Sequence, residues 1–189
     1  DGATDVDLAT GAITLNTSAA NGSVALTGGN VDGAQNLTIT AGSGAVSFDG
    51  VGQNTAIGAL DVDTTGALTF NDALAAGSIA LDGAANVDLA TGAVTLDTSA
   101  ANGVVTFATA GAIDGGQNLT ITAGSGAVNL SAIGAGTAIG ALDIDTTGTT
   151  TVNGNIVAGS IALDGATDVD LATGAITLNT SAANGSVAL

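Results

Sequence analysis

Residues 37–48 read LTITAGSGAVSF, and residues 119–130 read LTITAGSGAVNL. Each stretch has an apolar–polar–apolar triplet, a short glycine-containing turn, and a second triplet of the same kind. Alternation with a period of two is typical of a β-strand with one buried face. Each triplet is too short to form a stable sheet alone, so it needs other copies to pack against.

Related motifs begin at Val6, Leu60, Val87, Leu142 and Val169. Stacked coils must resemble one another, whereas the strands of a sandwich have no such need. We therefore predict an all-β fold: a right-handed parallel β-helix (β-solenoid) with about three short strands per coil and about seven coils. The competing architecture is an array of antiparallel β-sandwiches, because regular short strands separated by turns fit it too.

A longer repeat contains these motifs. Residues 1–26 and 164–189 are identical, and residues 82–107 match them at 19 of 26 positions, so the period is 81 and then 82 residues. We assign repeat unit 1 to residues 1–81 and repeat unit 2 to residues 82–163, each with three coils. Residues 164–189 then start repeat unit 3. We expect one continuous solenoid that is an internal piece of a longer array.

The charge of the chain is extreme. It has 189 residues, no Lys, Arg or His, and 17 acidic residues, which give a net charge of −17. Binding to phosphate or to anionic lipid requires basic side chains, so we expect no nucleic-acid partner and no adsorption to anionic membranes. No apolar run has the length of a membrane span, so we also expect no membrane insertion.

The residue types that most enzymes use are missing. Without His, Cys, Lys, Arg, Glu or Tyr, the chain cannot form a Ser–His–Asp triad, a cysteine nucleophile or a lysine Schiff base. The GSG sequences at 42–44 and 124–126 lie in predicted turns with no helix after them, so they do not indicate a phosphate site. We predict that the protein is not an enzyme and needs no cofactor, with Ca²⁺ as the one candidate.

Calcium is suggested by aspartates in the first strand of several motifs. If the motifs stack coil on coil, Asp61 lies against Asp88, and Asp143 lies against Asp170. Like charges at this spacing repel one another unless salt screens them or a hard cation bridges them. Both alternatives remain open at this point. The candidate metal ligands are Asp61, Asp63, Asp88, Asp143, Asp145 and Asp170.

The same alignment predicts a small, weakly polar face formed by the second strand of each motif. Such a face can be a solvated β surface, a lateral contact with another rod, or an ice-binding array. Its outward column would consist of Thr14, Ser47, Thr69, Thr95, Asn129, Thr151 and Thr177.

The sequence NLTITAGSGAVSF at 36–48, with its copy at 118–130, resembles repeats of filamentous-haemagglutinin-type adhesins and giant autotransporter passengers. This resemblance implies a right-handed β-helix, export from a bacterium and a role as a stalk, adhesin or surface fibre. The secretion domain of that family is not among these residues, and the complete lack of basic residues departs from its usual composition.

We therefore expect a structural repeat segment of a long bacterial extracellular fibre or surface stalk that gives reach and rigidity. The alternative is an adhesin module that grips glycan or another cell through an Asp/Asn/Thr face. The expected location is extracellular or on the bacterial cell surface. The expected partners are further copies of the same repeat, end to end and laterally.

Overall fold

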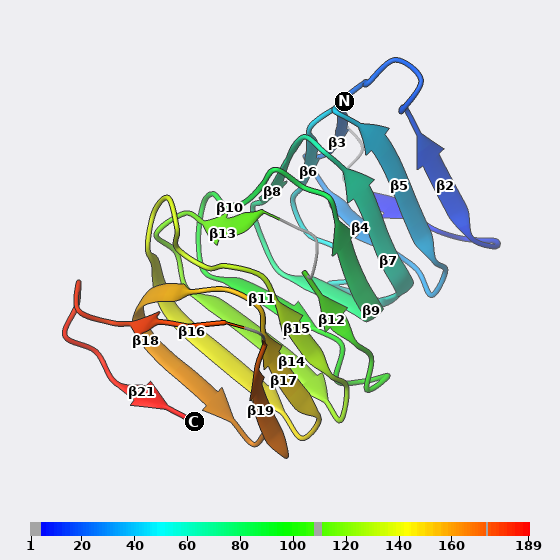
Figure 1. Ribbon diagram of the computed structural model, residues 1–189. Helices are drawn as coiled ribbons and strands as arrows, with labels where there is room; N and C mark the ends of the chain where they lie inside the picture. The colour runs from blue at the N-terminus through cyan, green and yellow to red at the C-terminus, as the bar shows by residue number, and fades with distance from the viewer. Residues whose placement is uncertain (1–4, 108–110, 173) are drawn as a thin grey trace.

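The computed structural model describes residues 5–107, 111–172 and 174–189. These residues form short strands and no helix. Every strand pair that they form is parallel. Figure 1 shows the turns stacked from the N-terminal end to the C-terminal end of the molecule. The predicted all-β parallel solenoid is confirmed, and the sandwich array is excluded.

Each turn has three sides, which we call face 1, face 2 and face 3 and define by strand register. Face 1 contains β2 (Ile13–Asn16), β5 (Leu37–Gly42), β7 (Ile57–Thr64), the second half of β9 (Leu74–Asp82), β12 (Val105–Thr106), β15 (Val128–Leu130), β17 (Thr149–Val152) and β19 (Asp168–Leu171). Face 2 contains β3 (Val24–Leu26), β6 (Val46–Phe48), β8 (Ala67–Phe70), β10 (Asn86–Leu89), β13 (Ala112–Asp114), the first half of β18 (Ile156–Asp164) and β20 (Leu178–Asn179). Face 3 contains β1 (Asp5–Asp7), β4 (Asn30–Asp32), the first half of β9, β11 (Val94–Asp97), β14 (Leu119–Gly124), β16 (Ile139–Thr146), the second half of β18 and β21 (Val187–Ala188).

The solenoid has about eight turns, one more than predicted. On face 1, for example, Leu37 pairs with Leu60, which pairs with Ile79, which pairs with Val105. These steps of 23, 19 and 26 residues are shorter on average than the coils that the motif spacing predicts. The prediction of three coils per repeat unit is therefore wrong. It left out positions such as Val51, which contributes to a face through single bridges to Val31 and Leu74.

The core is the interior of the triangle. Inward side chains alternate with outward ones, so β5 and β14 both read buried, half-buried, buried along their length. Face 2 of repeat unit 1 places Phe48 against Phe70 with ring centroids 5.9 Å apart. Repeat unit 2 has Leu130 and Val152 at the matching sequence positions. Burial of these aliphatic and aromatic columns is the main stabilising contribution to the stack.

One corner of the triangle is built from glycine because successive turns approach there backbone to backbone. A Cβ atom added to Gly103 would overlap the carbonyl oxygen of Gly77, and one added to Gly126 would overlap that of Gly103. Only glycine fits where another backbone comes this close. The glycines at this corner are thus required by the stacking of one backbone on another.

Loops of adjacent turns interlock at this corner. The loop 98–103 is closed by Thr98 Oγ1, which donates to the carbonyl oxygen of Gly103 at 2.7 Å. Asn102 has a positive φ of 54°, a conformation that Asn tolerates better than most residues. Its Oδ1 accepts a hydrogen bond from the backbone N–H of Ser125, one turn further on, at 2.9 Å. In repeat unit 1, at the corner between faces 1 and 2, Asn21 accepts the equivalent bond from Ser43.

Candidate functional site: the acidic surface

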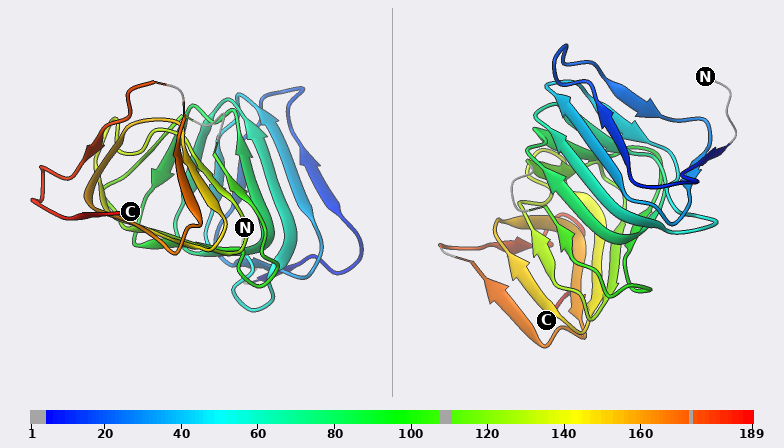
Figure 2. Two further views of the ribbon diagram at one scale, coloured as in Figure 1. Left: turned by 60° about the horizontal axis from the view of Figure 1, so that its bottom comes forward. Right: turned by 90° about the vertical axis from the view of Figure 1, so that its right-hand side faces the viewer.

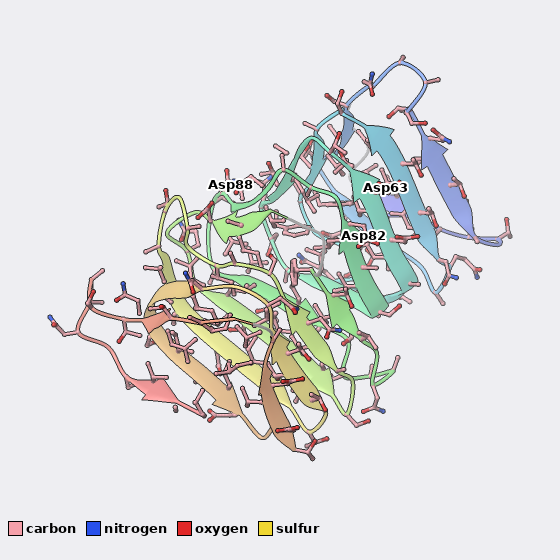
Figure 3. The ribbon with its side chains drawn as sticks, viewed as in Figure 1. Asp63, Asp82 and Asp88 are labelled. Atoms are coloured by element: carbon pink, nitrogen blue, oxygen red, sulfur yellow. The ribbon has the colours of Figure 1, made fainter. Side chains whose placement is uncertain are left out.

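The predicted stack of Asp61 on Asp88 does not form. Asp61 lies on face 1 between Thr38 and Ala80, and Asp88 lies on face 2 between Thr69 and Asp114. Figure 3 shows Asp88 well apart from the aspartates on β7 and β9. The prediction was wrong because it assumed a whole number of turns between equivalent motifs.

The second predicted stack fails for the same reason. Asp143 lies on face 3 between Thr120 and Ala162. Asp170 lies on face 1 opposite Thr151. Asp61 is therefore not beside Asp88, and Asp143 is not beside Asp170.

Asp88 lies opposite Asp114, and the other two candidate ligands also have acidic neighbours. Asp63 lies directly opposite Asp82, and Asp145 lies directly opposite Asp164. Figure 3 shows Asp63 and Asp82 on adjacent strands of the same face. Asp82 and Asp164 are absent from the predicted ligands because each follows an apolar sequence, IAL at 79–81 or 161–163, and lies outside the alternating motifs.

Asp61 belongs to this acidic cluster. Desolvation raises the pKa of Asp61 above its ordinary value, and the negative charges of Asp82 and Asp63 raise it further. The chain has no Lys, Arg or His to offset these charges. The cluster therefore holds a proton on Asp61 more tightly than free aspartate would.

Metal binding gains no further support from the geometry. Across the described ranges, no group of three or more acidic side chains is arranged to hold a metal ion. Pairs such as Asp63 and Asp82 supply carboxylate oxygens, the ligand type that Ca²⁺ prefers. Calcium binding therefore stays a prediction.

Two further aspartates have a structural role. Asp32 is buried, and its carboxylate accepts hydrogen bonds from the backbone N–H groups of Asn54 and Thr55 at 2.9 and 3.1 Å. Burial alone would raise the pKa of Asp32, but these donors lower it below its ordinary value. Asp114 accepts the equivalent bonds from Gly136 and Thr137. Both carboxylates hold the loop of the following turn.

The strand residue beside each of these carboxylates differs between the repeats. The amide nitrogen of Asn86 donates to Asp114 Oδ2 at 2.9 Å. At the matching position, Asp5 can share a hydrogen bond with Asp32 only when one of the two carries a proton. Desolvation, this hydrogen bond and the charge of Asp32 raise the pKa of Asp5.

The predicted threonine face is also wrong as a single surface. Thr14 and Thr151 lie on face 1, Thr69 lies on face 2, and Thr95 lies on face 3. Just after strands β6 and β8 of face 2, Asn71 Nδ2 donates to Asp49 Oδ1 of the preceding turn at 3.0 Å. The predicted column of small residues is therefore divided among the three faces and does not form one surface for lateral packing or for ice binding.

No helix within the described residues is long and apolar enough to cross a membrane. No protein-family model, curated protein or solved structure matches this chain. Fold and surface chemistry are therefore the basis for assigning a function.

Proposed function

We propose that this chain is a structural repeat segment of a long bacterial extracellular fibre or surface stalk, which gives reach and rigidity. The observation that carries the proposal is the continuous stack: β9 joins strands of both repeat units, because it pairs with β7, β11 and β12. No boundary in hydrogen bonding separates one repeat from the next. Additional repeats would therefore lengthen one rod and not add flexible beads.

The surface chemistry agrees with a passive role. The chain supplies no His, Cys, Lys, Arg, Glu or Tyr for nucleophilic or acid–base catalysis beyond its aspartates. Its faces carry Asp, Asn, Thr and Ser, which are strongly hydrated and keep an isolated rod in solution. We propose a non-enzymatic protein whose partners are further copies of the repeat, end to end.

Survival outside the cell is a further argument for export. A protease that cuts after Lys or Arg has no cleavage site anywhere in the 189 residues. The parallel stack also hydrogen-bonds its strands on both sides along most of its length, as β7 does with β5 and β9. Both features suit a fibre exposed to secreted proteases, as in the adhesin family that residues 36–48 resemble.

Immunogold electron microscopy of intact cells of the producing organism tests the proposal. An antibody raised against the 189-residue chain should label filaments or a layer outside the envelope of unpermeabilised cells. Label confined to the cytoplasm would overturn the extracellular assignment. The same chain applied to an array of glycans should bind none of them, because sugar platforms usually use Trp or Tyr, and both are missing. Specific glycan binding would favour the adhesin alternative.

A further inference from the structure

The number of strand positions in one repeat can be read directly from the register. Each strand pairs with the third strand position after it along the chain, which lies one turn later. Val6 pairs in this way with Val31, and Ile79 with Val105. From Val6 to the residue before its copy Val87, the chain passes through eleven strand or bridge positions, and one inward residue represents each of them. They are Val6, Ile13, Val24, Val31, Leu37, Val46, Val51, Leu60, Leu68, Leu74 and Ile79.

Eleven positions at three per turn make three and two-thirds turns, so the repeat and the turn are out of phase. The copies of one strand show this directly. Val6 lies on face 3, its copy Val87 lies on face 2, and the next copy, Val169, lies on face 1. The acidic cluster moves in the same direction, since Asp63 and Asp82 lie on face 1 but Asp145 and Asp164 on face 3.

We propose that the rod presents its repeated surface as a three-sided screw, one face further round with each repeat. At about 4.8 Å between turns, each repeat advances by about 18 Å. The same face returns only after three repeats, which make eleven turns and about 53 Å. The identical sequences of consecutive repeats thus point in three directions.

The screw determines how a second copy can associate. Every face carries aspartate, with Asp61 on face 1, Asp88 on face 2 and Asp143 on face 3. Side-by-side packing of two rods would bury these carboxylates, and the chain has no basic residue with which to pair them. The surface therefore disfavours side-by-side association of two rods and favours end-to-end association. This consequence rests on the proposed fibre function, whereas the phase of the repeat does not.

Disulfide formation between introduced cysteine pairs tests the phase in the full chain, which has no cysteine of its own. A disulfide needs Cα atoms within about 4.4–6.8 Å, a range that paired residues on adjacent parallel strands meet and the middle residues of strands on two different faces do not. The variant Asp61→Cys/Ala80→Cys should form the bond on mild oxidation, since these residues are register partners. The variant Asp61→Cys/Asp88→Cys should not.

Thr38→Cys/Asp61→Cys is the matched control, because this pair is adjacent in either phase. Asp143→Cys/Ala162→Cys and Asp143→Cys/Asp170→Cys repeat the comparison in unit 2. Efficient bonding of Asp61 with Asp88, or of Asp143 with Asp170, would overturn the screw. So would a control that bonds while the Asp61/Ala80 pair stays reduced. The disulfide results are independent of the immunogold result. Failure of the screw and failure of the proposed function can therefore be told apart.

Discussion

Thr150 places a hydroxyl group in the core where repeat unit 1 has Leu68. The side chain is 0 % exposed, and its Oγ1 has no hydrogen-bond partner within the described part of the chain. A buried hydroxyl without a partner costs about 1–3 kcal/mol. Thr150→Val replaces this hydroxyl by a methyl group of similar size, so it should raise the free energy of unfolding by about 1 kcal/mol or more.

Urea unfolding followed by circular dichroism measures the change. Thr151→Val, at the adjacent outward position, is the matched control and should change the free energy of unfolding by less than about 0.5 kcal/mol. Destabilisation by Thr150→Val, with no effect of the control, would mean that the hydroxyl has a partner after all.

Gly103 and Gly92 differ in the space that surrounds their Cα atoms. A side chain at Gly103 would meet the backbone of Gly77, whereas a Cβ at Gly92 meets no atom within 4 Å. Gly103→Ala should therefore destabilise the protein by about 2 kcal/mol or more, because the backbones of two turns must separate. Gly92→Ala should be neutral or slightly stabilising. Equal thermal shifts for the two variants would contradict the close approach of the turns.

Among the elements, the loop 98–103 gives a direct measure of what stacking contributes. Asn102→Ala loses both a residue that tolerates positive φ and the bond to Ser125. Asn184, in the loop 180–185, has the same φ of about 53°, but the described chain has no turn beyond it. Asn102→Ala should therefore cost about 1 kcal/mol more in free energy of unfolding than Asn184→Ala. Equal costs would show that the bond between turns contributes nothing.

The sequence predicts strands well where apolar residues alternate, as in 37–48, and poorly where one apolar residue occupies a face. Val51 joins face 3 through single bridges although its neighbours are glycines, which give no period of two. Missing such positions gave three turns per repeat unit in place of three and two-thirds. A shift by one strand position moves a side chain to another face of the turn. The predicted stack of Asp61 on Asp88 is wrong for this reason.

At the scale of the whole molecule, acid should stabilise the fold before it destabilises it. Asp61 and Asp5 have raised pKa values, so the folded state binds their protons more tightly than the unfolded state. Stability from these two groups is gained as the pH falls toward the ordinary value of 3.8. Asp32 has a lowered pKa, so its contribution is lost as the pH falls below 3.8.

The melting temperature should therefore rise between pH 7 and about pH 4 and fall at lower pH. Scanning calorimetry across this range measures it. Asp61→Asn should flatten the rise, because it removes a carboxyl group whose pKa is raised in the folded state. A melting temperature that falls steadily from pH 7 to pH 4 would contradict the account of the acidic cluster.

Residues far apart in sequence lie one above another on the same face of a single stack (Figure 2). Thr14 and Thr151 both lie on face 1, separated by six steps between paired strands. Pulsed electron–electron double resonance between spin labels on Thr14→Cys and Thr151→Cys measures this separation. A single stack with about 4.8 Å between turns should give a narrow distribution within several ångström of about 29 Å. A distance well above about 40 Å, as separate domains in a row would give, would contradict it.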